Sequence, residues 1–430
     1  MIVKMLEIIK RIVNNPNLFV ESFKKRNFNF DPKKIINLYE KRKELVVLIS
    51  NNNSERNKLS LVIADNISKK KEKENIKIIE DIKKIKEINN LKEIELKKIE
   101  DEMIQIVSEL PNLPDSDVKC GGKENNEVVS IYNKPVSDAK FKLKDHVELA
   151  RNLNLIDYDR SAKISGKNTW IYIGEGAELE WALINYFIHE HLKNGYKFML
   201  LPHIVNKKSS FGAGHFPKFK DDVFKIEGED KYLISTAETV LVNLHSEEIL
   251  KQEELNKKYF AFTPCYRKEA GSYRTQERGM IRGYQFNKVE IVQFTSEKNS
   301  DDAFEEMLNI VINLVNNLGL HFRVSKLAAG DCSFSMAKTY DVEVFLPSMG
   351  IYKEVSSVSN ARDYQSIRNF TRYKDKEGNI HFCHILNASG LATSRLFPAI
   401  LEQFQQEDGS VIIPEILRPF FGNKSIISKK

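Results

Sequence analysis

The chain has 430 residues, of which 41% are hydrophobic and 29% charged, so it is long enough for two or three domains and has enough apolar residues for a core. This composition excludes a disordered chain. The formal net charge is +6, and residues 1–110 hold 24 Lys and Arg against 18 Asp and Glu, so the entire basic excess lies in the first quarter. A basic first quarter points to a polyanionic partner, although an ordinary solvated helix surface has a similar composition.

The cysteines and the N-terminal segment exclude further classes. The four cysteines are far apart and form no CxxC or Cys/His cluster, so neither a structural zinc site nor a disulfide framework is expected. They are Cys120, Cys265, Cys332 and Cys383. The first segment, MIVKMLEIIKRIV, is apolar, but charged residues interrupt it every three or four positions, which predicts an amphipathic helix and neither a signal peptide nor a membrane span. We therefore expect a cytoplasmic protein without a membrane partner.

The first quarter is expected to be helical. A first helix is predicted over residues 3–26, and Asp31 before Pro32 marks the start of the next. From there seam positions recur at alternating steps of three and four, which is the heptad pattern of a coiled coil. One seam runs Ile35, Leu38, Arg42, Leu45, Ile49, Asn52, Arg56, Leu59 and Ile63. A second runs Ile82, Ile85, Asn89, Lys92, Leu96, Ile99, Met103, Ile106 and Leu110, and the polar residues 66–75 between them form the predicted turn.

Two heptad helices joined by a short turn predict an antiparallel coiled-coil hairpin over about residues 33–110. Each limb has about 35 residues, so at 1.5 Å per residue the arm would project about 50 Å, with no other core to support it. We place the helical arm at residues 1–110, a linker rich in Pro, Gly and Asp at 111–126, and a second domain at 127–430. Because most heptad hairpins mediate protein contacts, the pattern alone favours an assembly element.

A β-hairpin around a loop rich in Arg, Glu and Gly is predicted at residues 259–294, YFAFTPCYRKEAGSYRTQERGMIRGYQFNKVEIVQF. Alternation places Arg267, Phe286 and Glu290 on one pleated surface. The guanidinium suits a phosphate or carboxylate, the ring can lie flat on a purine, and Glu269 and Glu290 could accept a hydrogen bond from an amine. A surface hairpin with solvated ion pairs has the same composition, so this stretch alone leaves both interpretations open.

Three more segments carry similar polar residues: LISTAETVLVN at 233–243, YKEVSSVSNARDYQSIR at 352–368 and HILNASGLATSRLFPAILEQF at 384–404. Together with the hairpin and the arm they resemble the bacterial type of seryl-tRNA synthetase, a class II aminoacyl-tRNA synthetase. The resemblance covers nearly the whole chain. It implies an α+β fold in which an antiparallel sheet with flanking helices forms the catalytic domain, joined to an N-terminal antiparallel α-helical coiled-coil arm.

The resemblance implies a serine–tRNA ligase that activates L-serine with ATP and Mg²⁺ and transfers serine to tRNA(Ser), and it leaves open whether tRNA(Sec) is a second acceptor. The arm would grip the tRNA, and a homodimer would form around Pro202 in FMLLPHIVN. The tRNA contacts expected on the arm are Arg42, Arg56, Lys58, Lys69, Lys70, Lys71 and Lys73. An amino-acid:carrier-protein ligase with a related core is the alternative, but such proteins lack a long arm.

The resemblance also assigns site residues. Arg267 and Arg395 would be catalytic, the first holding the α-phosphate and the substrate carboxylate and the second the γ-phosphate. The serine-binding residues would be Thr236, Ala237, Glu238, Glu290, Asn387 and Ser389. The ATP-binding residues would be Arg267, Lys268, Glu269, Arg282, Phe286, Glu354, Val355, Ser356, Ser357 and Arg395. Mg²⁺, which prefers hard oxygen ligands, is assigned to Glu354 and Ser357.

Two of these assignments carry conditions set by the residues themselves. Alternation puts Glu354 and Ser356 on one strand face, so Ser357 reaches the site only if the strand bulges or ends there. A last strand ending at Gly390 precedes a helix that contains Pro398. Because proline is tolerated only in the first turn, the helix should start near residues 393–394, with the catalytic arginine at its positive end.

Three residues depart from the pattern of the resembled family. Tyr284 stands where a His is usual, and Trp181 stands where an Arg is usual. Pro398 has no usual counterpart. None of the three is an assigned ligand, so the departures concern the expected dimer contact near Trp181 and the local shape near Tyr284.

Overall fold

The structure, a computed structural model, describes residues 2–71, 75–134, 141–269 and 279–429. The chain divides into two compact units. The first unit comprises Met1–Ser22 and Asn29–Leu110, and the second comprises Phe23–Phe28 and Pro111–Lys430. The short segment Phe23–Phe28 thus belongs to the second unit although it lies in the first quarter of the sequence.

The N-terminal region folds as two helices. Helix α1 spans Ile2–Asn14, and α2 follows at Pro16–Lys25. The single helix predicted over residues 3–26 is therefore wrong. Proline has no N–H to donate and clashes with the preceding turn, so Pro16 ends one helix, and its fixed φ suits the first position of the next.

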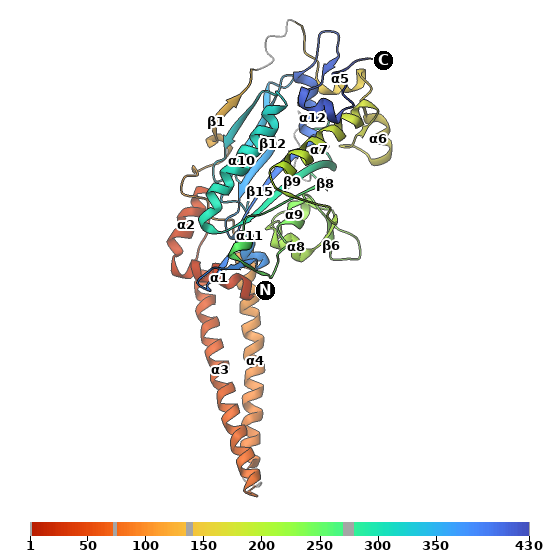
Figure 1. Cartoon of the computed structure of the whole chain (residues 1–430). Coiled ribbons are helices and arrows are strands. Elements are labelled where there is room, and N and C mark those ends of the chain that lie inside the picture. The colour runs from red at the N-terminus through yellow and green to blue at the C-terminus, as the bar shows by residue number, and fades with distance from the viewer. Residues whose placement is uncertain (1, 72–74, 135–140, 270–278, 430) are drawn as a thin grey trace. The chain divides into compact units, whose positions relative to one another are not determined.

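Helices α3 (Lys33–Ser68) and α4 (Asn75–Ser108) lie side by side and form the predicted antiparallel hairpin (Figure 1). Every predicted seam position is buried or half-buried. The Asn52 amide donates to Asn89 Oδ1 at 2.8 Å, and Arg42 Nε lies 2.8 Å from Glu100 Oε1. These polar pairs fix the register, because a shift of one helix against the other would separate both.

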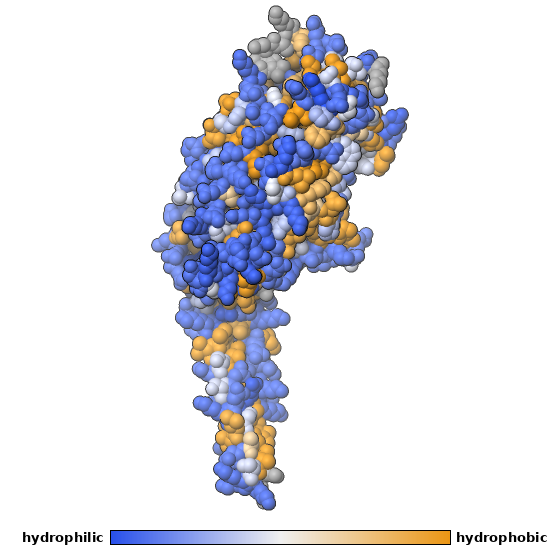
Figure 2. Space-filling view, viewed as in Figure 1, coloured by the Kyte–Doolittle hydropathy of each residue, from blue (hydrophilic) through white to orange (hydrophobic). Residues whose placement is uncertain are grey.

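The seam is not the only support of the hairpin. Helix α1 packs against both α3 and α4, so the expectation that the arm has no other core is wrong. Its buried residues are Met5, Ile8, Ile9 and Ile12. Figure 2 shows the outer surface of α3 and α4 as a mixture of polar and apolar side chains, among which Val47 and Leu91 are exposed.

The residues predicted to contact tRNA lie along this arm and near its tip. Four of them are exposed: Lys58, Lys69, Lys70 and Lys71. Arg42 and Arg56 are half-buried in the seam, and Lys73 lies outside the described residues. Their contacts with tRNA stay predictions.

The second unit is built on an eight-stranded sheet with the order β1-β10-β11-β12-β15-β9-β8-β4. Its strands are β1 (Glu127–Tyr132), β4 (Lys197–Met199), β8 (Lys257–Tyr266), β9 (Gln285–Thr295), β10 (Phe322–Lys326), β11 (Lys338–Leu346), β12 (Ile351–Asn360) and β15 (His384–Ala392). All neighbouring pairs are antiparallel except β4 and β8, which are parallel. The predicted α+β class is confirmed, with one parallel pair at the edge of the sheet.

Helices cover one face of this sheet (Figure 1). They are α7 (Glu175–Lys193), α10 (Ser300–Asn317) and α12 (Thr393–Gln403), and α5 (His146–Asn152) packs on α12. The main core lies between these helices and sheet residues such as Phe260 and Ile291. Because side chains alternate along a strand, the neighbouring Ala261 and Glu290 face the opposite side, where the polar site lies.

Smaller elements surround the opposite face. The helices α8 (Lys207–Gly212), α9 (Glu238–Leu241) and α11 (Tyr364–Asn369) pack near a second apolar cluster that contains Val292 and Phe294. The remaining elements are α6 (Tyr158–Ser165), β2 (Ile156–Asp157), β3 (Ile171–Tyr172), β5 (Ile204–Asn206), β6 (Lys231–Leu233), β7 (Ile249–Lys251), β13 (Arg372–Lys374), β14 (Ile380–Phe382), β16 (Val411–Ile412) and β17 (Ile426–Ile427). These pieces position loops around the pocket.

The junction of β15 and α12 differs in part from the prediction. The strand continues past Gly390 to Ala392 through an irregularity in its register with β9. Helix α12 begins at Thr393, as predicted. Pro398 is its sixth residue, so it lies beyond the first turn that the prediction assumed. Because proline has no backbone N–H, the helix lacks the one hydrogen bond that residue 398 would donate to the carbonyl of residue 394.

Three observations concern classes of site. All four cysteines are unpaired in the structure. Among helices in the described ranges, none is both long and apolar enough to cross a membrane. Within the same ranges no three His, Cys, Asp or Glu side chains gather as a metal site.

Candidate active site

The polar face of the sheet carries a pocket of about 640 Å³, lined by residues from parts of the chain that are far apart in the sequence. The predicted site residues that line it are Thr236, Glu238, Arg267, Glu269, Arg282, Glu290, Glu354, Ser357, Asn387, Ser389 and Arg395. Phe286 and Val355 line an adjoining recess. The fold therefore brings most of the predicted residues into one cavity.

At one end, three buried side chains form a hydrogen-bonded group. Lys288 and Glu290 share one side of β9, and Thr236 precedes α9. Lys288 Nζ forms an ion pair with Glu290 and donates to Thr236 Oγ1 at 2.8 Å. The Thr236 hydroxyl donates to Glu290 Oε2 at 2.9 Å. Burial raises the pKa of Glu290, and the charge of Lys288 acts in the opposite direction.

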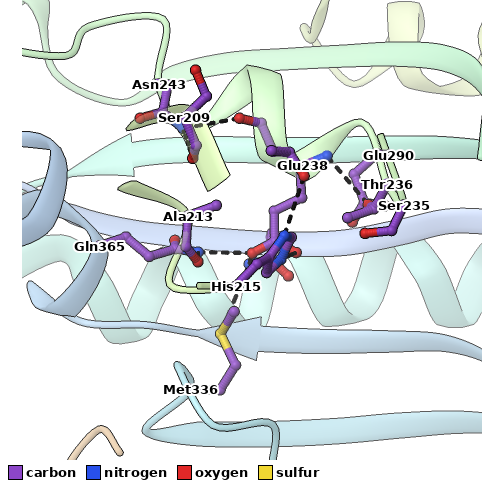
Figure 3. A network of polar contacts seen from close by, with 12 residues as sticks. Ser209, Ala213, His215, Ser235, Thr236, Glu238, Asn243, Glu290, Met336 and Gln365 are labelled. Atoms are coloured by element: carbon purple, nitrogen blue, oxygen red, sulfur yellow. Dashed lines mark hydrogen bonds and ion pairs between the residues drawn. The ribbon is translucent and has the colours of Figure 1, made fainter. Parts of the chain in front are cut away.

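Glu238, the first residue of α9, is buried beside this group (Figure 3). Its Oε1 accepts from Gln365 Nε2 at 2.7 Å and from Asn387 Nδ2 at 3.0 Å. Its Oε2 lies 3.7 Å from His215 Nε2. Burial alone would raise the pKa of Glu238, but hydrogen bonding and charge from His215, together with Lys288, outweigh it and lower the pKa. A buried carboxylate kept charged in this way suits an ammonium ligand.

Three arginines also line the pocket: Arg267, Arg282 and Arg395. Arg267 follows β8, and its Nε donates to the main-chain oxygen of Ser235 at 3.3 Å. Its guanidinium carbon lies 5.1 Å from the centre of the Phe286 ring. Nearby, Arg282 Nη1 lies 2.9 Å from Glu269 Oε2. Planar guanidinium groups at a pocket wall suit phosphate or carboxylate oxygens.

Strand β12 carries a bulge that decides which residues reach the pocket. Its register with β11 shifts by one residue between Ser356 and Glu354, which makes Val355 the extra residue. Both Glu354 and Ser357 therefore line the pocket, so the condition set by strand alternation is met. The Ser356 hydroxyl is buried and donates to the main-chain oxygen of Ser389 at 2.5 Å.

The third residue of α12, Arg395, lies beside β12. Its Nη1 donates to the main-chain oxygen of Glu354 at 2.6 Å and lies 3.5 Å from that residue's Oε1. It belongs to the first helical turn, where the helix dipole is positive. The predicted metal ligand and the predicted γ-phosphate arginine are thus neighbours.

Three predicted residues do not line the pocket. The Lys268 side chain is exposed, Ala237 is buried in the second apolar cluster, and Ser356 is buried within the sheet. Their assigned roles stay predictions.

Several side chains that line or support the pocket were not assigned from the sequence, and three of them contact assigned residues: Lys288, Gln365 and His215. Lys288 lies on the same strand face as Glu290, so alternation was a usable signal for it. Gln365 stands in the quoted segment 352–368, but its contact with Glu238 depends on how α11 packs on α8, which in turn packs on α9. His215 had no signal of its own, because its position beside Glu238 comes from the turn after α8.

Comparison with known proteins shows to which protein family the chain with this pocket belongs. A family model described as the seryl-tRNA synthetase N-terminal domain matches residues 5–114, and one described as the tRNA synthetase class II core domain (G, H, P, S and T) matches residues 219–404. Serine–tRNA ligase 2 of Clostridium acetobutylicum is 58% identical over 338 residues, which are 77% of this chain and 79% of that protein. The chain belongs to the seryl-tRNA synthetase family.

Two further comparisons cover almost the full length. The serine–tRNA ligase of Fervidobacterium nodosum is 39% identical over 420 residues, which are 97% of this chain and 98% of that protein. The crystal structure of seryl-tRNA synthetase from Pyrococcus horikoshii complexed with ATP matches with a TM-score of 0.89 and 28% identity, covering 98% of this chain and 99% of that one. Ligation of serine to tRNA with ATP is therefore the activity of this family member, as predicted.

Two of the departures from the family pattern, Trp181 and Tyr284, are not among the residues that line the pocket or its recess. Trp181 on α7 is 55% exposed, and its ring is tilted against Phe262. Tyr284 meets Phe224 edge to face, with 6.3 Å between the ring centres. Neither residue replaces a side chain that lines the pocket.

Proposed function

We propose that the pocket binds L-serine at its buried end and ATP beside its three arginines, so that the reacting groups meet beside Arg267. The observation that carries this proposal is the placement of Thr236, Glu238 and Glu290 at one end of the same cavity that Arg267 and its neighbours line. An amino acid has an ammonium group to pair with the carboxylates and a carboxylate to pair with the guanidinium.

Charge supports the choice of ligand at the buried end. Two buried carboxyl groups, Glu238 and Glu290, face one lysine, Lys288, so an ammonium group would bring the charges into balance. The Thr236–Glu290 pair can also bond the serine hydroxyl. A site built to bond a hydroxyl rejects alanine and glycine by about 10⁴-fold, because its own polar groups would be left unpaired. Threonine would have to be excluded by volume.

The part of the pocket that the arginines line suits a nucleotide. Adenine would stack on Phe286, beside the Arg267 guanidinium, and Glu269 would accept from the exocyclic amine. Arg267 would hold the α-phosphate together with the serine carboxylate. Arg395, at the positive end of α12, would hold the γ-phosphate.

The reaction then needs positioning more than covalent chemistry by the protein. A serine carboxylate oxygen attacks the α-phosphorus of ATP, the bond from that phosphorus to the bridging oxygen breaks, and pyrophosphate leaves. The arginines would neutralise the charge that grows on the phosphate oxygens. A ribose hydroxyl of the terminal adenosine of tRNA next attacks the seryl carbonyl carbon, and AMP leaves.

The oxygen atoms around β12 fit a divalent cation. Glu354 and Ser357 both reach the pocket, and Oδ1 of the neighbouring Asp341 is buried without a hydrogen-bond partner among the described residues. Burial, with the charges of Glu354 and Glu343, raises the pKa of Asp341 well above its ordinary value. We assign Glu354 and Ser357 as the Mg²⁺ ligands, with water and phosphate oxygens completing the shell. When bound, Mg²⁺ would neutralise phosphate charge.

The partners follow from the other surfaces. The arm would bind tRNA(Ser) through phosphates, which its basic excess supports, and tRNA(Sec) is a second acceptor to be tested. A homodimer is supported by two exposed apolar residues, Trp181, at 55%, and Leu200, at 83%, which stands two residues before Pro202. The protein would act in the cytoplasm, where charged tRNA is consumed.

The test is amino-acid-dependent exchange of pyrophosphate with ATP, measured with each of the twenty amino acids. We expect exchange with serine that requires ATP and Mg²⁺. Strong exchange with alanine or threonine and none with serine would overturn the assignment of the buried end. Sedimentation of the same protein tests the dimer.

A further inference from the structure

The loop at residues 328–337, between β10 and β11, forms one wall of the pocket. It contributes Asp331, Ser333, Ser335 and Met336 to the lining. The Met336 sulfur lies 3.8 Å from Asn387 Nδ2, which donates to Glu238. Figure 3 shows Met336 pointing toward this network. The place of the loop therefore limits the space at the proposed serine end.

A single side chain from the segment Phe23–Phe28 holds this loop. Arg26 Nη1 donates to the main-chain oxygens of three loop residues, and its Nη2 donates to a fourth. These oxygens belong to Ala329 at 3.1 Å, Cys332 at 3.3 Å, Ser333 at 3.4 Å and Met336. A guanidinium holds its donors in one rigid plane, so Nη1 and Nη2 can reach four carbonyls that follow no helix or strand pattern, with one Nη1 hydrogen shared between two of them.

A second segment, residues 111–122, holds the same loop. Asn112 Nδ2 donates to the main-chain oxygen of Ser335 at 3.0 Å. The backbone N–H of Gly330 donates to the oxygen of Gly121 at 2.8 Å, and Gly121 N–H donates to the oxygen of Lys25 at 2.9 Å. The two segments are therefore joined to each other as well as to the loop. They are also where the chain passes between the first unit and the second.

We propose that Arg26 is a positioning residue for the amino-acid pocket. By tying four carbonyls of the loop 328–337 it fixes Met336 against Asn387 and so sets the affinity for serine. The proposal rests on the assignment of the serine end to Glu238 and Asn387. The ATP-facing residues lie on β9, β12 and α12 and in the segment after β8, all outside the loop, so the effect of Arg26 should be selective for serine.

The experiment measures the KM values for serine and ATP in pyrophosphate exchange, with the full-length protein. Arg26→Ala should raise the serine KM about tenfold or more, because a displaced wall no longer fits the substrate, and should leave the ATP KM unchanged. Arg26→Lys, which keeps the charge and up to three donors, should recover part of the loss. Asn112→Ala should act in the same direction as Arg26→Ala. The matched control is Arg418→Ala, which removes a guanidinium bonded to the main-chain oxygen of Ile413 in the same unit and lines no part of the pocket.

Each outcome decides the proposal. A parallel rise of both KM values, or no change in either, would overturn it, as would an equal serine effect in Arg418→Ala. Thermal unfolding of each variant separates a folding defect from a pocket defect. If Arg26→Ala does not fold, the serine and ATP KM values of Arg26→Lys and Asn112→Ala carry the test. If pyrophosphate exchange by the wild-type protein did not depend on serine, the proposed function itself would be wrong, whatever the Arg26 variants show.

Discussion

The arm and the pocket use buried polar residues in different ways. In the arm, Asn52 faces Asn89 and Arg42 faces Glu100, so each polar group meets its partner across one seam. In the pocket, Glu238 gathers donors from α11 and β15, with His215 from the turn after α8 nearby. The arm's pairs are local to two helices, whereas the pocket's network exists only when several distant segments are folded together.

The buried polar residues therefore have different roles: those of the arm align two helices, and those of the pocket would bind a ligand. The polar pairs of the arm satisfy each other, so they specify how α3 and α4 align and leave little capacity for a ligand. The pocket holds an excess of acidic over basic groups at its buried end and is lined elsewhere by three arginines, so it is completed by a ligand of matching charge. Perturbing each region should therefore have a distinct signature.

The largest effect is expected from Arg267→Ala. It should lower serine-dependent pyrophosphate exchange by about 10³-fold, because the guanidinium would stabilise the charge that develops at the α-phosphate. Arg151→Ala, which removes a more exposed arginine outside the pocket, is the control and should keep its exchange rate. Wild-type exchange in Arg267→Ala, with folding verified by circular dichroism, would remove Arg267 from the site.

Replacing residues 34–108 with a short Gly/Ser turn should separate the function of the arm from that of the pocket. The second unit contains the whole sheet, so exchange should survive, while transfer of serine to tRNA should fall by about 10²-fold or more because phosphate contacts are lost. The intact protein should lose tRNA affinity as salt rises, and the shortened one should show a shallower slope. Normal charging by the shortened protein, or loss of exchange, would make the arm an assembly or stability element.

Glu290→Gln should change specificity more than ATP binding. The preference for serine over alanine in exchange should fall by about 10²-fold, because the carboxylate that bonds Thr236 and Lys288 is lost. Glu343→Gln is the matched control, since that carboxylate lines the same pocket but bonds Arg323 and Ser325. An unchanged serine-to-alanine ratio in Glu290→Gln would exclude Glu290 from serine recognition.

The smallest effect concerns pH and the stability of the second unit. His191 is fully buried, its Nδ1 has no hydrogen-bond partner among the described residues, and burial lowers its pKa to about 4 from 6.5. The unfolded chain binds a proton on this histidine more readily than the folded protein does. The free energy of unfolding is therefore highest above about pH 6.5 and falls as the pH decreases toward 4. The loss corresponds to about 3 kcal/mol of unfolding free energy.

Urea unfolding of the second unit between pH 7.5 and 4 measures this loss. His191→Gln, which cannot take up a proton, should show a flatter dependence on pH. The first unit has no histidine, so its unfolding should not follow this titration. Equal slopes for wild type and His191→Gln would contradict the prediction.

Much of the fold could be predicted because its signals are local. Steps of three and four fixed both limbs of the arm, and alternation placed Arg267 and Glu290 on one strand face. Pro16 broke a helix that the apolar pattern alone had joined. The bulge at Val355 depends on how β12 pairs with β11, so the sequence could state it only as a condition.

The candidate site was predictable to a smaller degree. The assigned residues came from resemblance to a family, and most of them line one pocket. His215 and Gln365 were missed because helix packing brings them to Glu238, and no regular spacing of residues in the sequence signals such a contact. Arg26 was also missed, because its partners are main-chain carbonyls. Every residue has such a carbonyl, so the sequence does not mark these partners.

The seven-residue repeat of the arm ties the lengths of its two limbs to each other. An insertion in α3 alone would misalign every pair beyond it, including Asn52 and Asn89, whereas seven residues added to both limbs at matched positions would keep all existing pairs. Each matched step would move the tip outward by about 10 Å, at 1.5 Å per residue. The length of the arm can therefore change only in steps of seven residues made in both limbs. Related proteins can evolve arms of other lengths in this way without disturbing the catalytic sheet.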